Sequence, residues 1–334
     1  MLEPPDITSD ELLARVADAY GIAADAAEFL PLGADARAWA FRVRAGDDTW
    51  FLKVRAGAVD RAGLEVPGYL AQRGMDHLVV PVRTVGGASF DRGDPYSLIV
   101  YPFVDGGSGG DVGLSESQQT ELGRSVRGFH DTPVNGSLAS LMRVETFVPK
   151  HLDRFGPLQR RVVTPLVADR FQRELADIWG PRVDEIRSIF DRAVELGHQA
   201  NRRADERVLC HGDIHAWNVL VRSDGGFCIV DWDETILAPR ERDLMFADGG
   251  IGGLDNDGRA FFAGYGEVSI DPVVMAYYRF EWVVQELVEF GEVVFDRDAG
   301  DATRADAVAS IAGLFEPDNV VEAASQADAA LTRG

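Results

Sequence analysis

A histidine, a carboxylate and a carboxamide lie within eight residues of one another, at His211, Asp213 and Asn218. A second carboxylate, Asp231, closes the apolar run 227–230 that follows them. A carboxylate can accept the proton of a hydroxyl group, and carboxylate and amide oxygens are ligands that suit Mg²⁺. Phosphoryl transfer to a hydroxyl requires such groups, because that reaction depends on positioning and charge neutralisation. We expect Asp213 to be the catalytic base, and Asn218 and Asp231 to hold Mg²⁺.

The spacing of these residues is specific. His211-x-Asp213-x-x-x-x-Asn218 matches the catalytic loop of protein kinases, H-R-D-x-x-x-x-N, without its arginine. Strand, loop, hairpin and a strand ending in Asp231 follow in the order that a kinase requires, which disfavours a surface loop with incidental polar residues. In such loops the histidine usually orders the backbone, so we expect His211 to be structural.

A candidate phosphate-binding cation lies upstream. Lys53 is flanked by Phe51, Leu52 and Val54, and a buried ammonium group needs a partner. We expect Lys53 to bind the nucleotide α- and β-phosphates and to pair with Glu65; an outward-facing surface lysine is the alternative. No Walker A motif occurs in the sequence, which argues against a P-loop kinase.

The segment 99–103 is the candidate hinge that holds adenine. Its alignment on the usual kinase pattern gives the carbonyl of Tyr101 as acceptor and the N–H of Phe103 as donor. Pro102 lies between them, where its missing N–H costs nothing.

Hydrophobic periodicity predicts the elements that position these residues. A helix is expected over 8–20 with Asp10 as its cap, a β-hairpin over 39–54, and a short helix over 59–65 that ends or kinks at Pro67. Strands at 79–85 and 96–101 would complete an antiparallel sheet of about five strands. The glycine-rich segment 102–110 reads as a flexible linker.

Beyond the linker the helical period dominates. Helices are predicted over 116–130, 164–178, 181–199 and 272–294, with further helix from 259 and from 303 to the end, and a β-rich island at 208–230. The fold class is therefore α+β, a bilobal protein-kinase-like fold. Residues 1–101 form the nucleotide-binding lobe, 102–110 the hinge, and 111–334 the helical lobe with the catalytic loop and substrate site.

These motifs resemble the aminoglycoside phosphotransferase family over about residues 30–278. The runs 211–220, 231–234, 237–246 and 98–103 are most similar to its spectinomycin phosphotransferase branch. The resemblance implies ATP as donor, with GTP as the alternative, Mg²⁺ as cofactor, and an aminocyclitol hydroxyl as acceptor. It assigns Asp213 as base, and places Lys53 with Glu65 on the phosphates. Trp217 departs from the family, which often has glycine before the asparagine.

A cationic acceptor would need carboxylates and aromatic faces near Asp213. Trp232, Asp233 and Glu234 directly follow the predicted metal ligand, and Glu281 and Trp282 lie on the helix 277–294. We predict that these five residues contact the substrate, although a solvated face is the alternative for the helix. Asp243 opens an apolar helical run, and we expect it to cap that helix and anchor the catalytic loop.

The 334 residues carry 55 acidic and 33 basic side chains, a net charge of −22. This balance disfavours nucleic acid and anionic membranes as partners. The sequence shows no signal peptide or membrane span, and Cys210 and Cys228 are expected to be buried thiols, so a cytoplasmic location and a monomer are expected, with a dimer as the alternative. Three functions stay open: an antibiotic kinase, a metabolic kinase for a choline-, homoserine- or sugar-like alcohol, and a non-catalytic nucleotide-binding module.

Overall fold

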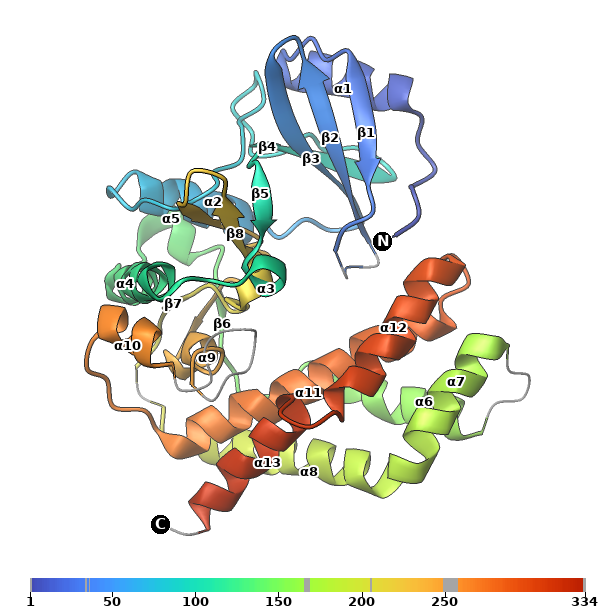
Figure 1. Ribbon diagram of the computed structural model, residues 1–334, viewed down its shortest axis with the longest axis vertical. Helices are drawn as coiled ribbons and strands as arrows, with labels where there is room; N and C mark the ends of the chain where they lie inside the picture. The colour runs from blue at the N-terminus through green and yellow to red at the C-terminus, as the bar shows by residue number, and fades with distance from the viewer. Residues whose placement is uncertain are drawn as a thin grey trace.

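The computed structural model describes residues 2–33, 35, 37–164, 169–204, 206–248 and 258–332. The described chain forms an upper lobe built on a β-sheet and a lower, mainly helical lobe (Figure 1). The predicted α+β, kinase-like class is confirmed.

The sheet of the upper lobe is antiparallel, with strands in chain order: β1 (Ala26–Leu30), β2 (Ala38–Ala45), β3 (Asp48–Ala56) and β4 (Tyr96–Pro102). The predicted hairpin is therefore confirmed as β2–β3. Side chains alternate along β3, so Leu52 and Val54 are buried in the core while Lys53 lies on the opposite face. Helix α1 (Ser9–Tyr20) buries Leu12 and Val16, and its cap is Thr8 rather than the predicted Asp10.

Two predictions for the upper lobe are wrong. Helix α2 (Arg61–Ala71) does not end at Pro67 but continues through it to Ala71. Residues 79–85 form no fifth strand. Their contact with the sheet includes a backbone hydrogen bond from the Val82 N–H to the Val100 carbonyl (2.8 Å).

Most of the segment 102–110 that was predicted as a flexible linker has regular structure: Pro102 ends β4, and residues 106–110 pack on the lower lobe. It forms strand β5 (Gly106–Ser108), which pairs with β8 (Val219–Arg222), and helix α3 (Gly109–Val112). Its glycines permit close contact: a Cβ atom at Gly106 would lie 2.0 Å from the Val221 carbonyl oxygen, and one at Gly110 would lie 2.3 Å from the Trp217 ring. The small residues therefore fasten the hinge onto the catalytic loop.

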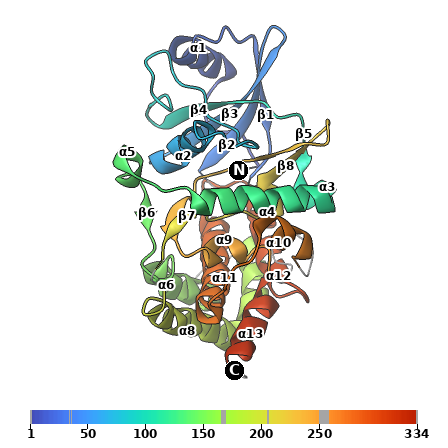
Figure 2. The ribbon, with the colours of Figure 1, turned by 90° about the vertical axis from the view of Figure 1, so that its left-hand side faces the viewer.

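The lower lobe is built around α11 (Pro272–Phe295), which packs against α8 (Val183–Ala200), α12 (Asp301–Leu314) and α13 (Val320–Leu331). Helix α4 (Glu116–Asp131) crosses directly beneath the upper lobe (Figure 2). The remaining described helices are α5 (Gly136–Ala139), α6 (Leu152–Val163), α7 (Arg170–Trp179), η1 (Gly180–Arg182), α9 (Glu241–Leu244) and α10 (Arg259–Tyr265). The sequence did not predict α6, and the single helix expected from 303 onward is two.

Short strands carry the predicted catalytic residues. Strand β7 (Val208–Cys210) pairs with β10 (Ile236–Ala238), which also pairs with β6 (Arg143–Val144). Strands β8 and β9 (Phe227–Ile229) form the predicted hairpin. The segment 211–218, including η2 (Ala216–Asn218), connects β7 to β8. None of the described helices is both long and apolar enough to cross a membrane.

Candidate active site

The backbone of the catalytic loop is held by a buried carboxylate. The oxygens of Asp243 accept hydrogen bonds from the N–H groups of His211 (2.9 Å) and Gly212 (2.7 Å). His130 Nε2 lies 3.1 Å from the same carboxylate. Asp243 lies inside α9, which follows Arg240, so its predicted role as a helix cap is wrong. The geometry agrees with its other predicted role, as the anchor of the loop.

His211 is part of the framework. Its ring is fully buried, its Nε2 donates to the Val230 carbonyl (3.0 Å), and its Nδ1 accepts from the Asp213 N–H (3.3 Å). This pattern requires the neutral ring with a proton on Nε2. Burial lowers the pKa of His211, which also favours the neutral form. The histidine therefore fixes the loop against Val230, which follows β9 and precedes Asp231.

The predicted base, Asp213, lies against Asn218 and His215. Asn218 Nδ2 donates to the Asp213 carbonyl (2.8 Å) and to its Oδ2 (3.2 Å), and His215 Nε2 lies 3.4 Å from that oxygen. Burial acts to raise the pKa of Asp213, but His215 and His211 outweigh it and hold the pKa at about 2. The carboxylate is therefore ionised and can accept a hydrogen bond from an acceptor hydroxyl.

The two predicted metal ligands flank the β8–β9 hairpin: Asn218 ends η2 directly before β8, and Asp231 follows the end of β9 by two residues. The Val230 N–H donates to the Asn218 carbonyl (3.0 Å), which brings Asp231 beside the loop. Asp231 has a left-handed backbone (φ 59°), and its side chain is about half exposed (49%). Since the Asn218 amide nitrogen is engaged by Asp213, its oxygen is available to a metal. One carboxylate and one amide oxygen fit Mg²⁺, which is bound by few protein ligands and keeps several waters.

Lys53 lies on the cleft side of β3, and its predicted partner is wrong. Its Nζ contacts Asp231 (3.1 Å) and Asp233 (2.9 Å). Burial would lower the pKa of Lys53, but these two carboxylates outweigh burial and raise it. Glu65 instead forms a two-fold ion pair with Arg83 (3.0 and 2.6 Å).

Arg55 belongs to the same cluster, and the sequence reasoning missed it. Its Nη1 contacts Asp35 (2.6 Å) and Asp233 (3.1 Å), and its Nε donates to the Ala58 carbonyl (3.1 Å). Residues two apart on a strand share a face, so Lys53 and Arg55 could have been paired from the sequence alone.

The hinge differs from the prediction. The Phe103 N–H donates to the Thr49 carbonyl (3.4 Å), so the predicted adenine donor faces β3. In an antiparallel pair alternate residues direct their backbone groups to the same neighbour, and Tyr101, which pairs with Phe51, therefore faces β3 as well. The side chains, unlike these backbone groups, face the predicted nucleotide site. The rings of Phe51 and Tyr101 lie 6.2 Å apart on the face of the sheet that carries Lys53.

Three of the predicted substrate residues lie elsewhere. Trp232 is 3% exposed and packs against Phe129 (5.0 Å) and His211 (4.5 Å), so it is a core residue. Asp233 faces the nucleotide side through Lys53. Glu281 is buried in an ion pair with Arg242 (2.9 Å), and both side chains are 5% exposed. The geometry does not support the substrate assignment of these residues, because packing and ion pairs already use their side chains.

The carboxylate of Glu234 is also engaged in ion pairs, whereas Trp282 lies near the catalytic loop. Lys150 and Arg143 (3.2 Å) hold the Glu234 carboxylate and outweigh burial, so its pKa is lowered. A cationic substrate would compete with two cations there, and the prediction for Glu234 loses its support. Trp282 is half-buried and packs edge-on against Phe246 (4.8 Å).

Trp282 belongs to a row of rings beside the predicted base. His215 lies 5.9 Å from both Phe246 and Trp217. Trp217 is half exposed (50%) and covers the backbone of Gly110. The row therefore runs from the hinge to α11 and ends in an exposed aromatic face.

Glu286, one helical turn beyond Trp282, supplies a carboxyl group that is not used by the fold. It makes no hydrogen bond or ion pair with the part of the chain that the structure describes. Burial, the neighbouring Glu289 and Asp213 raise the pKa of Glu286 to about 8, and His215 opposes them. A half-buried acid without a partner is unfavourable for a fold and suits a cationic ligand. The sequence places Glu286 beside Trp282 on α11, but not next to Asp213.

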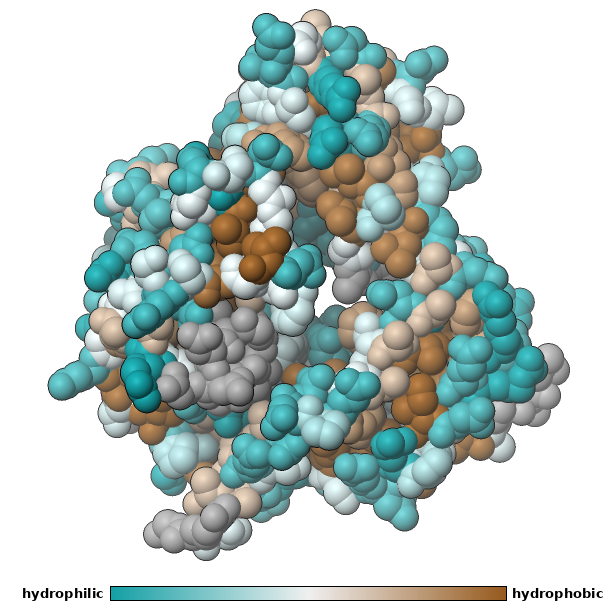
Figure 3. Space-filling model, viewed as in Figure 1, coloured by the Kyte–Doolittle hydropathy of each residue, from teal (hydrophilic) through white to brown (hydrophobic). Residues whose placement is uncertain are grey.

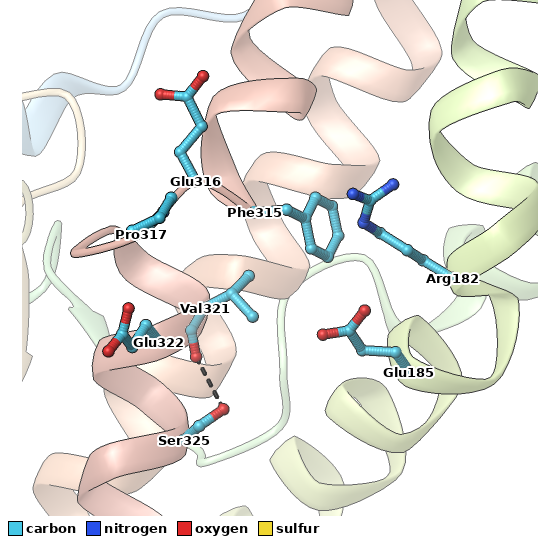
Figure 4. A pocket seen from close by; sticks show the side chains of 8 residues that line it. All are labelled: Arg182, Glu185, Phe315, Glu316, Pro317, Val321, Glu322 and Ser325. Carbon is cyan, nitrogen blue, oxygen red and sulfur yellow. Dashed lines mark hydrogen bonds between the residues drawn. The ribbon is translucent and has the colours of Figure 1, made fainter.

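The surface is hollowed between the two lobes (Figure 3). A separate pocket of about 340 Å³ lies away from this cleft, and none of the site residues above lines it (Figure 4). Its lining comes from η1, α8, and the end of α12 through α13: Arg182, Glu185, Phe315, Glu316, Pro317, Val321, Glu322 and Ser325.

A catalytic-type loop, an aspartate shortly after a strand and a lysine on a strand of the antiparallel sheet define a kinase-like enzyme that phosphorylates hydroxyl groups. The model of the Phosphotransferase enzyme family matches residues 26–278, and the chain belongs to this family. No curated protein sequence matches the chain.

Solved structures agree with this assignment. The complex of spectinomycin phosphotransferase APH(9)-Ia with ADP and spectinomycin superposes with a TM-score of 0.86 at 29% identity, over 97% of this chain and 99% of that one. Its AMP-bound complex gives a TM-score of 0.81 at 28% identity, over 96% and 98%. Amicoumacin kinase hAmiN, with AMP-PNP and Ca²⁺, shares the fold alone (TM-score 0.58, 14% identity, over 94% and 93%).

Proposed function

We propose that the protein transfers the γ-phosphate of ATP to a hydroxyl group of a cationic aminocyclitol, spectinomycin or a close relative. The similarity to the spectinomycin phosphotransferase complex over 97% of the chain carries this proposal. The aromatic row and the unpaired Glu286 support it, since an ammonium group is attracted both to ring faces and to carboxylates.

Each residue of the site has a separate role in the proposed phosphoryl transfer. Asp213 orients the acceptor hydroxyl and takes its proton as the oxygen bonds to the γ-phosphorus and the bond to ADP breaks. Lys53 binds the nucleotide phosphates. Asn218 and Asp231 would hold Mg²⁺, which neutralises phosphate charge when bound. Trp217 and Glu286 bind and orient the acceptor.

A panel of acceptors tests the proposal. Purified protein, ATP and Mg²⁺ would be incubated with spectinomycin, other aminocyclitols, and amino alcohols such as ethanolamine and choline, with Asp213→Asn as the control. We expect phosphorylation of spectinomycin or a relative, and a loss of kcat of about 10²–10⁴-fold in the control. Turnover of an amino alcohol but of no aminocyclitol would instead support a metabolic kinase. Resistance is tested separately, by growth of a susceptible bacterium that expresses the protein in spectinomycin.

A further inference from the structure

A kinase-like site needs a carboxylate that holds its phosphate-binding lysine in place, and protein kinases use a glutamate on a helix. Glu65 is the only acidic residue of α2, and it pairs with Arg83 rather than with Lys53. The Lys53 ammonium group instead contacts Asp231 and Asp233. The position of the helix glutamate is therefore taken by a residue from the lower lobe.

The packing of α2 explains this exchange. A Cβ atom at Gly63 would lie 2.6 Å from the Trp232 carbonyl oxygen and 3.2 Å from the Asp233 Cα. The helix backbone thus rests directly on the segment that carries Asp233. Because residue 63 is a glycine, the helix has no side chain at this contact that could reach Lys53. Asp233, on the adjoining segment, contacts Lys53 instead.

Asp233 is better suited to this task than Asp231. Asp231 is the predicted metal ligand, so its carboxylate has a second use when the site is filled. Asp233 is less exposed, at 30% against 49%. Its Oδ2 also contacts Arg55 (3.1 Å) as well as Lys53 (2.9 Å), so one oxygen joins two cations on the same face of β3. Arg55 thereby fixes the carboxylate that fixes the lysine.

We propose that Asp233 is the positioning residue of Lys53, in place of a helix glutamate, and that Arg55 holds Asp233 in that position. The proposal rests on the proposed function in one respect, namely that Lys53 binds the nucleotide phosphates. It predicts that Asp233 acts through Lys53, and that Glu65 does not.

A double-mutant cycle tests this. Lys53→Met, Asp233→Asn and their combination would be compared for thermal unfolding without ligands and for kcat with ATP, with Glu65→Gln in parallel. We expect Asp233→Asn to lower kcat about 10–100-fold, and to lower it little further in the Lys53→Met background. Added together, the Tm losses of the two single variants should exceed the Tm loss of the double variant by about 2 °C or more. Glu65→Gln should change kcat less than about twofold, and its Tm effect should add to that of Lys53→Met.

Other outcomes would overturn the proposal. If Asp233→Asn lowers kcat as much in Lys53→Met as in the native chain, Asp233 acts independently. If Glu65→Gln causes the larger loss and couples to Lys53, the helix glutamate is the positioning residue after all. Should Asp233→Asn fail to fold, Arg55→Met takes its place in the experiment. We expect Arg55→Met to lower kcat, and Arg55→Lys to retain more of the native kcat than Arg55→Met does. If neither effect is observed, the proposal is wrong. If Lys53→Met alone binds ADP and turns over as the native chain does, the proposed nucleotide site fails, which is a separate result.

Discussion

Glu286 leads to the sharpest prediction, because it is a half-buried acid to which the described residues offer no hydrogen-bond or ion-pair partner. Its pKa is raised from 4.5 to about 8 by burial and by the charges of Glu289 and Asp213. Between these pH values the folded chain keeps a proton that the unfolded chain has lost. The free energy of unfolding must then fall as pH rises, by about 1.4 kcal/mol per pH unit. Below pH 4.5 both states are protonated and the effect vanishes.

The magnitude follows from that interval. A shift of this size corresponds to at most about 5 kcal/mol, and water at the mouth of the cleft reduces it to roughly 2–3 kcal/mol. Glu286→Gln has the shape of the protonated acid and cannot ionise. Relative to the native chain, the variant should therefore gain roughly 2–3 kcal/mol of stability on going from pH 5 to pH 8.

Urea unfolding of the ligand-free proteins at pH 5 and pH 8 measures this difference. Glu292→Gln is the matched control, because Glu292 lies on the same helix in a surface ion pair with Arg154. Its effect should stay below about 1 kcal/mol at both pH values. A stability difference between Glu286→Gln and the native chain that does not change with pH would refute the reasoning. The same variant should raise the KM for a cationic acceptor about tenfold, since one charge contact is lost.

Three further substitutions separate the roles assigned above. Asp243→Asn puts an N–H donor where the loop needs an acceptor, and should cost about 1–3 kcal/mol together with most of kcat; urea unfolding and initial rates measure both. Trp217→Ala removes the exposed ring and should raise the acceptor KM about 5–10-fold, while the KM for ATP in the same kinetics stays within twofold. Glu281→Gln leaves Arg242 buried and unpaired, so it should destabilise the chain by about 3–5 kcal/mol. Its acceptor KM should not change, and a raised KM would return Glu281 to the substrate site.

Local patterns predicted the fold well where the pattern itself is local. The β2–β3 hairpin follows from alternation and a turn, and α4, α8 and α11 follow from helical periodicity. The segment 102–110 was misjudged because its glycines suggest freedom, whereas they serve the close packing of β5 and α3 on neighbouring backbone. That requirement depends on a strand more than a hundred residues away, so composition could not show it.

The site shows the same limit. Motif spacing brought Asp213, Asn218 and Asp231 to one place, because short strands and a loop fix their distances. Spacing could not determine that Glu65 faces Arg83, since the rotation of α2 is set by its contact with the backbone of residue 232. Trp232 likewise turns into the core after the left-handed Asp231. Arg55 was not predicted, but the alternation of side chains along the strand would have placed it on the same face as Lys53.

The charges of the cleft explain why its ligands belong there. Asp213, Asp231 and Glu286 place three carboxyl groups around one loop, and Lys53 and His215 balance them only in part. Ionisation of Glu286 opposes folding when the site is empty, because burial and the nearby charges of Glu289 and Asp213 disfavour a further negative charge there. A divalent cation at Asp231 and an ammonium group at Glu286 would each remove part of that opposition. Ligands that bind the folded chain in this way must raise its unfolding temperature, and under the proposed function we expect a cationic acceptor to raise it more than a neutral one of the same shape.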